Sequence, residues 1–74
     1  MANNTWHYQL MRHTDADTGE MHYAIHEYYP EDELLDDLWT FLPVVVDGDS
    51  VEDVKQMLQM MLEDIEKHGV KDYE

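Results

Sequence analysis

The sequence predicts an α+β fold in which an antiparallel β-hairpin is covered on one face by a single C-terminal α-helix. Side chains alternate in character along residues 5–13 and 21–29, and a glycine-containing turn lies between these two stretches. After residue 50, apolar side chains recur every three or four positions, as in an amphipathic helix. The 74 residues make one domain, 1–74, which buries roughly 60% of the surface that the unfolded chain exposes. Dimerisation would enlarge such a modest core.

The first two strands are expected to pair so that Asp15 meets Glu20 across a four-residue loop, with Gly19 in the left-handed conformation. In this pairing, polar side chains lie opposite polar ones and apolar side chains opposite apolar ones. A shift of one residue would mix polar and apolar side chains on both faces of the hairpin. This register places His13 opposite His22, Met11 opposite Ala24, Leu10 opposite Ile25 and Trp6 opposite Tyr29.

The same register predicts one face packed under the helix and one face open to solvent. The expected apolar face consists of Trp6, Tyr8, Leu10, Tyr23, Ile25 and Tyr29. The expected solvent face consists of His7, Gln9, His13, His22, His26 and Tyr28.

The segment between the hairpin and the C-terminal helix, residues 31–42, fits two structures. Leucine and tryptophan at helical spacing after an acidic first turn favour a short helix that stops before Pro43. A third strand over residues 38–42 fits as well and would extend the hairpin to a three-stranded meander.

The C-terminal helix has clear start and stop signals. Ser50 is placed to cap its N-terminus, Glu52 and Asp53 favour the positive end of the helix dipole, and Gly69 supplies a left-handed stop. Met60 lies off the centre of the apolar stripe and is the methionine expected to be exposed to a partner or a second subunit. The stripe consists of Val51, Val54, Met57, Leu58, Met61, Leu62 and Ile65.

Composition limits the function. A net charge of -14, from 18 acidic and 4 basic residues, repels nucleic acid and anionic membranes and attracts basic protein surfaces. The absence of cysteine excludes disulfides and thiolate metal ligands. The longest aliphatic run, residues 44–46, is too short to span a bilayer, and the first ten residues lack the pattern of a signal peptide. We expect a cytoplasmic protein.

Candidate catalytic and metal-binding residues have simpler explanations. His13, His22 and His26 share a predicted face and could gather around zinc, copper or nickel, but we expect them to be solvent-facing polar residues of an exposed sheet. The segment DADTGE lacks the glycine and bidentate glutamate of a calcium loop, and DGDSVED runs straight into a helix, so turn and cap duties account for their acids. No phosphate-binding loop or activated nucleophile stands out. We therefore expect no enzymatic activity and no cofactor.

The acidic residues around the middle segment and the start of the C-terminal helix have no expected role in the core. They predict docking on a basic protein, with the carboxylates imitating the phosphates of nucleic acid so that they block a nucleic-acid-binding partner. A metal-binding module and a homodimeric structural subunit remain the alternatives. The predicted partner-binding residues are Glu31, Asp32, Glu33, Asp36, Asp37, Asp47, Asp49, Glu52 and Asp53.

Several short motifs, HEYY, WT, PV and GDS followed by an acidic helix, resemble a group of small, acidic, uncharacterised bacterial proteins. The resemblance covers most of the chain from Trp6 onward. It implies a bacterial or phage source and a third strand leading to Trp39, and it implies no activity. The stretch PEDELLDDLWTFL departs from that group, in which a glycine-bearing turn is expected.

Overall fold

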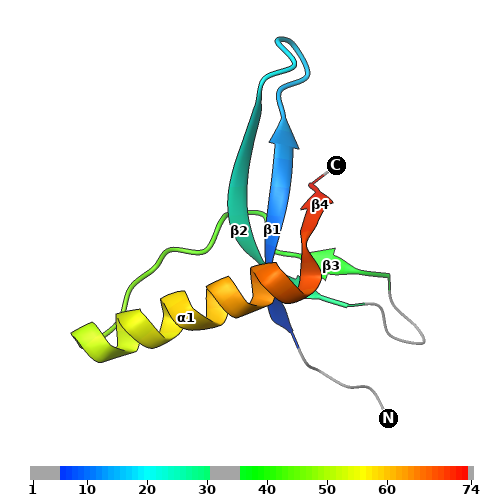
Figure 1. Cartoon of the computed structure of the whole chain (residues 1–74). Helices are drawn as coiled ribbons and strands as arrows, with labels where there is room; N and C mark the ends of the chain where they lie inside the picture. The colour runs from blue at the N-terminus through cyan, green and yellow to red at the C-terminus, as the bar shows by residue number, and fades with distance from the viewer. Residues whose placement is uncertain (1–5, 31–35, 74) are drawn as a thin grey trace.

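The computed structural model, which describes residues 6–30 and 36–73, has the predicted α+β architecture. Its elements in chain order are β1 (His7–Thr14), β2 (Met21–Tyr29), β3 (Leu38–Trp39), α1 (Val51–His68) and β4 (Val70–Asp72). The strands form one sheet in the order β3-β2-β1-β4 (Figure 1). β4 runs parallel to β1, so the sheet is mixed, whereas the sequence predicted only antiparallel pairing.

The hairpin has the predicted register. His13 lies opposite His22 and Leu10 opposite Ile25. The backbone N–H of Asp15 donates to the carbonyl of Glu20 at 2.8 Å, and Gly19 has a φ of 78°. Backbone N–H groups of Asp17 and Thr18 donate to the Asp15 carboxylate, which lowers the pKa of Asp15. The turn chemistry therefore fixes the pairing of the two long strands.

The described part of the middle segment is extended. Leu38 and Trp39 form β3 and pair with Tyr29 and Tyr28 of β2. The chain then continues along β2, where the backbone N–H of Val44 donates to Ile25 at 2.7 Å. The alternative of a short helix is therefore wrong over residues 38–42. The free edge of β2 satisfies the backbone hydrogen bonds of this segment, which a helix would otherwise satisfy internally. Residues 31–35, with their leucines, lie outside the described residues.

Both ends of α1 follow the sequence signals. Ser50 has an extended backbone, and its hydroxyl accepts from the backbone N–H of Asp53 at 3.1 Å. Gly69 has a φ of 69°, and its N–H donates to the carbonyl of Ile65. The positive φ turns the chain so that Val70 begins β4 opposite Leu10, where the sequence predicted only a capping contact.

Half of the predicted solvent face of the hairpin is part of the core, which corrects the sequence analysis. His22 is exposed as predicted, and His7 and His13 are half-buried. Gln9, Met11 and His26 are fully buried, and Tyr28 is nearly so. The sheet curls until β3 and β4 approach each other, and the rings of Trp39 and Tyr73 lie 6.2 Å apart across this face. Short strands at both edges therefore cover polar side chains that a flat hairpin would leave in water.

The opposite face is only partly covered. α1 contacts the sheet mainly through β1, and the N-terminal half of the helix projects beyond the sheet (Figure 1). Tyr8 and Met61 are buried there, and the carboxylate of Asp64 accepts from the backbone N–H of Tyr8 at 2.9 Å. Trp6, Tyr23 and Tyr29, which were predicted to lie under the helix, are exposed. Tyr23 and Tyr29 belong to β2, whereas α1 contacts mainly β1, and Trp6 precedes the first residue of β1.

Candidate binding surfaces

The start of α1 carries a group of four exposed carboxylates. We call Asp47, Asp49, Glu52 and Asp53 the acidic end of α1. The DGDS turn and the Ser50 cap set these residues around the first helical turn, at the end of the helix that projects from the sheet (Figure 1). Lys55 approaches Glu52 at 3.7 Å, but both side chains are largely exposed, so the pair neutralises little of this charge. The acidic end of α1 is therefore an accessible anionic surface.

The other predicted partner-binding acids lie elsewhere. Asp36 is exposed and Asp37 is half-buried just before β3, on the opposite side of the molecule from the start of α1 (Figure 1). The Asp37 carboxylate accepts from the hydroxyl of Tyr28, and burial together with this bond raises the pKa of Tyr28 to about 12. Asp37 thus has a structural bond to the sheet. Glu31, Asp32 and Glu33 lie outside the described residues.

The histidines of the hairpin meet on the inner face of the curled sheet. His26 Nδ1 lies 2.8 Å from the carbonyl oxygen of Thr40, so this nitrogen carries a proton and donates. His26 Nε2 lies 2.9 Å from His13 Nε2, and in the neutral ring it accepts from His13. His22 stacks on His13 with ring centroids 4.7 Å apart. The three candidate ligands are therefore brought together, as a hydrogen-bonded and stacked cluster.

This geometry does not favour the metal-binding alternative. The two Nε2 atoms point at each other at hydrogen-bond distance, whereas two metal ligands would point at an ion between them. Within residues 6–30 and 36–73, no group of three histidine, aspartate or glutamate side chains is placed to hold a metal ion. The cluster instead joins β1, β2 and the segment after β3.

Tyr73 closes the cluster from the C-terminal end. Its ring stacks on His13 at 4.2 Å, and its hydroxyl donates to the carbonyl of Phe41. A second stack joins His7 to His68 at the end of α1, with ring centroids 3.6 Å apart. Burial, and then the neighbouring His7, lower the pKa of His68. The sequence analysis missed both stacks because each joins β1 to residues about 60 positions later.

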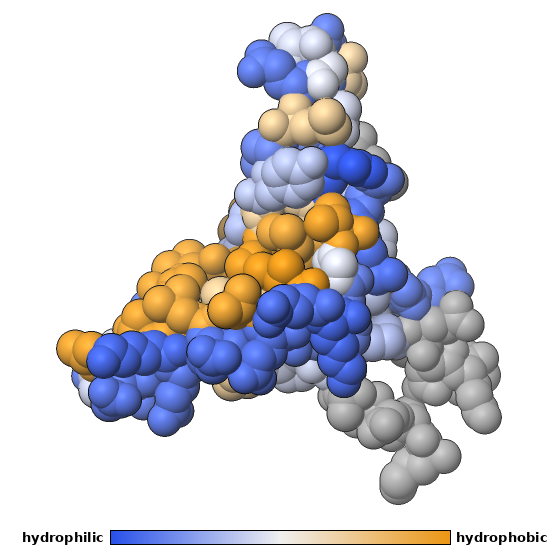
Figure 2. All heavy atoms as spheres, in the orientation of Figure 1, coloured by the Kyte–Doolittle hydropathy of each residue, from blue (hydrophilic) through white to orange (hydrophobic). Residues whose placement is uncertain are grey.

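A second accessible surface lies on α1 and is apolar. The apolar surface of α1 consists of Val51, Val54, Leu58, Leu62 and Ile65, which lie on one side of the helix. Val51 is 72% exposed, Leu58 50% and Leu62 52%. In Figure 2, hydrophobic residues run along one side of the projecting helix, with hydrophilic residues along the other. The predicted stripe exists, but only Met61 is buried in it. Val54, Met57 and Ile65 are half-buried, and Val51, Leu58 and Leu62 are exposed.

Met60 is 51% exposed, as the sequence predicted, and it lies on the opposite side of the helix from Leu58. Met57 is half-buried and Met61 is buried. Met60 is thus a lone exposed apolar residue among polar neighbours, whereas Leu58 belongs to a continuous surface.

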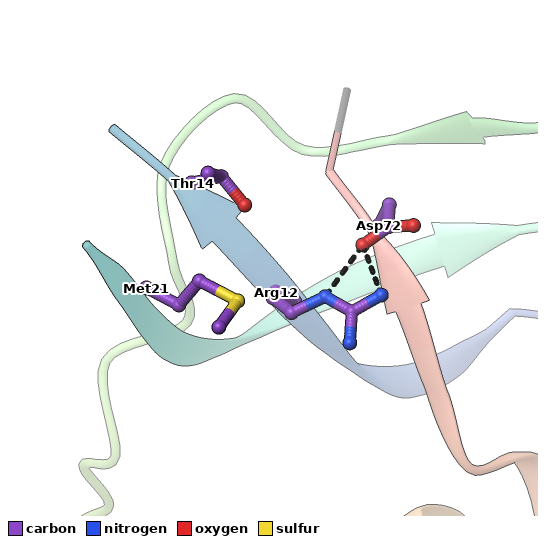
Figure 3. A pocket seen from close by; sticks show the side chains of 4 residues that line it. All are labelled: Arg12, Thr14, Met21 and Asp72. Carbon is purple, nitrogen blue, oxygen red and sulfur yellow. Dashed lines mark hydrogen bonds and ion pairs between the residues drawn. The ribbon is translucent and has the colours of Figure 1, made fainter. Parts of the chain in front are cut away.

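An open pocket lies on the outer face of the sheet, lined by Arg12, Thr14, Met21 and Asp72 (Figure 3). Both Nε and a terminal nitrogen of Arg12 lie 2.7 Å from the same Asp72 oxygen. This ion pair joins β1 to β4, so the one arginine of the chain is engaged in holding the edge strand.

Comparisons with known proteins add no assignment: no family model, no curated protein and no solved structure matches the chain. In residues 6–30 and 36–73, no helix is both long enough and apolar enough to cross a membrane.

Proposed function

We propose that this protein is a non-enzymatic binding protein that docks on a basic protein surface through the acidic end of α1. The observation that carries the proposal is the exposure of Asp47, Asp49, Glu52 and Asp53 at a projecting helix end, in a chain of net charge -14. The chain has 18 acidic residues and only 4 lysines and arginines, so most carboxylates have no cation within the chain to pair with. Fixed, exposed carboxylates attract a basic partner over a distance set by the ionic strength.

The proposed form of this docking is mimicry of nucleic acid. A helix end places several carboxylates at fixed positions, as a nucleic-acid strand places its phosphates, and a basic groove evolved for phosphates would accept them. The protein would then block a nucleic-acid-binding partner by occupying its groove. The fold limits the contact to one group of acids at a time, because Asp36 and Asp37 lie on the opposite side of the molecule from the acidic end of α1 (Figure 1).

The test is capture from a lysate of the source organism, followed by displacement. The immobilised protein is expected to retain a basic nucleic-acid-binding protein at low salt and to release it on addition of duplex DNA or of salt. Release by neither, or capture of proteins without a basic surface, would contradict the proposal.

Two variants with equal charge identify the surface. The triple variant Asp47→Asn, Asp49→Asn and Glu52→Gln removes three carboxylates from the acidic end of α1 and is expected to weaken capture at least tenfold. The control, Asp17→Asn, Glu20→Gln and Glu66→Gln, removes three exposed carboxylates outside the predicted partner-binding residues and has the same net charge. Equal loss in both variants would show that overall charge, and not this surface, governs binding.

A further inference from the structure

The apolar surface of α1 is only partly covered within the described chain. Val54 and Ile65 are half-buried, whereas Val51, Leu58 and Leu62 are at least half exposed on the same side of the helix. Figure 2 shows hydrophobic residues along one side of the helix. Monomeric soluble proteins rarely expose contiguous apolar patches larger than a few hundred Å². The acidic docking proposed above uses the end of the helix and leaves this side surface free.

The chain is more extended than a compact monomer of its mass. Its accessible surface is 5886 Å² for a mass of 8.8 kDa, whereas a compact monomer of this mass exposes about 4800 Å². The excess of roughly 1100 Å² belongs to the whole extended molecule, to which the projecting hairpin and the projecting half of α1 both contribute (Figure 1). It is of the order of the approximately 800 Å² that each partner buries in a standard protein interface. The radius of gyration, 13.8 Å, also exceeds the roughly 11 Å expected for a compact domain of this length.

We infer that a second copy of this chain covers the apolar surface of α1, with the two helices antiparallel about a two-fold axis near Leu58. In this arrangement Leu58 faces Leu58 of the partner subunit. Val51 faces Ile65 of the partner subunit, and Val54 faces Leu62 of the partner subunit, because these positions are equidistant from Leu58 along the helix. The surface is thus complementary to itself, as a two-fold interface requires.

The charge distribution of α1 favours this antiparallel arrangement. Glu52 and Asp53 lie in its first turn, and Lys67 and His68 in its last turn. The last turn also contains Glu66, and Lys67 lies on the opposite side of the helix from Leu58, so the side-chain charges contribute little across the interface. Antiparallel pairing opposes the two helix dipoles, whereas a parallel pair would align them and bring the acidic first turns together. The helix dipole therefore favours the antiparallel pair.

The first test measures the mass of the purified protein against concentration by sedimentation equilibrium. We expect a reversible dimer of twice 8.8 kDa, in the absence of any other protein. A protein that is monomeric up to the highest soluble concentration would overturn the inference and would leave the proposed docking on a basic partner untouched.

A matched pair of variants locates the interface. Leu58→Glu places two carboxylates at the axis and is expected to weaken dimerisation on the order of 100-fold. Met60→Glu changes a residue of equal exposure on the opposite side of the helix, 51% against 50%, and is expected to leave the dimer nearly unchanged. A dimer broken by Met60→Glu and not by Leu58→Glu would place the interface elsewhere and refute the inference.

Cysteine substitution gives a readout that does not depend on disrupting the helix. The natural chain has no cysteine, so Leu58→Cys introduces a single thiol close to its own copy across the axis. Mild oxidation is expected to link this variant into a covalent dimer, at a rate at least tenfold above that of Met60→Cys. Equal rates for the two variants would overturn the two-fold arrangement.

Discussion

Gln9 shows how a polar residue becomes part of the core of this protein. Gln9 lies in β1, and its side chain is fully buried next to Gly69, the residue that precedes β4. The amide nitrogen donates to the carbonyls of Leu10 and Gly69, at 3.0 and 2.8 Å, and the amide oxygen accepts from His7. In the described residues, no buried side-chain nitrogen or oxygen lacks a hydrogen-bond partner. Burial of this amide is therefore compensated, and its bond to Gly69 helps to position the start of β4.

The substitution Gln9→Met, which is similar in size, is expected to reduce the free energy of unfolding by about 1–3 kcal/mol, because it leaves the Gly69 carbonyl without this donor. Urea unfolding followed by circular dichroism measures the change. Gln59→Met on the exposed side of α1 is the control and is expected to change stability by less than about 0.5 kcal/mol. Equal effects at both positions would show that the buried amide bonds contribute nothing specific.

His68 gives the protein a pH dependence of known sign. Burial, followed by the proximity of His7, lowers the pKa of His68 below its ordinary value of 6.5 in the folded state. Below pH 6.5 the unfolded chain therefore binds a proton more readily than the folded chain, so acidification favours unfolding. The contribution of His68 to stability is present above pH 6.5 and is lost as the pH falls.

The free energy of unfolding is accordingly expected to fall between pH 7.5 and pH 5.5, and less steeply in His68→Asn, which cannot titrate in this range. Urea titrations of both proteins at several pH values measure the two slopes. The other four histidines are the same in both proteins, so only the difference between the slopes reports on His68. Identical slopes would show that its pKa does not change on folding.

At the level of elements, α1 is attached to the sheet through its C-terminal half, by Met61, the Asp64 carboxylate and the His68 ring. Met61 is 3% exposed and is the one fully buried residue of α1. The chain passes from this helix directly into β4, so the position of the helix also determines the position of the edge strand. A small number of contacts near Met61 therefore holds both elements against β1.

Met61→Ala is expected to reduce the free energy of unfolding by about 2–5 kcal/mol, as for other methionine truncations in a core. Met60→Ala, one residue away and half exposed, is expected to change it by less than about 0.5 kcal/mol. Denaturant unfolding of the two variants under identical conditions measures the contrast. Similar losses would mean that the helix is not anchored through Met61.

The hairpin and α1 could be predicted from the sequence because their signals are local. Asp15 and Gly19 specify the turn, and Ser50 and Gly69 specify the ends of the helix. β4 could not be predicted, because three residues of ordinary composition become a strand only when β1 lies beside them. The burial of His26 escaped prediction for a related reason: the carbonyl of Thr40, which accepts from its ring, comes from a segment whose pairing the sequence left open.

The candidate surfaces were predicted to different extents. The acidic end of α1 follows from the cap sequence, since charged residues next to a helix start stay in solvent. The separation of Asp36 and Asp37 from it depends on how far α1 projects, which the sequence does not specify. The apolar surface of α1 was recognised as a stripe, but periodicity cannot distinguish an apolar residue covered by its own sheet from one that faces outward.

At the scale of the whole molecule, the net charge of -14 opposes the folded state, because folding brings like charges closer together. Sodium chloride screens this repulsion, so the urea midpoint is expected to rise between low salt and half-molar salt. The double variant Asp47→Lys and Asp49→Lys makes the net charge four units less negative and is expected to show a smaller rise. A midpoint that falls with added salt would show that attractive ion pairs outweigh the repulsion.

The parallel pairing of β4 with β1 has a consequence for how the protein is made. Leu10 pairs with Val70, so the outer edge of β1 is completed by residues that are synthesised 60 positions later. During translation the hairpin can form early, but Gln9 and the histidine cluster stay without the cover of residues 69–73 until these have left the ribosome. A chain that stalls before β4 is therefore expected to need chaperones, and premature termination is expected to yield a hairpin with an open edge that is prone to aggregate.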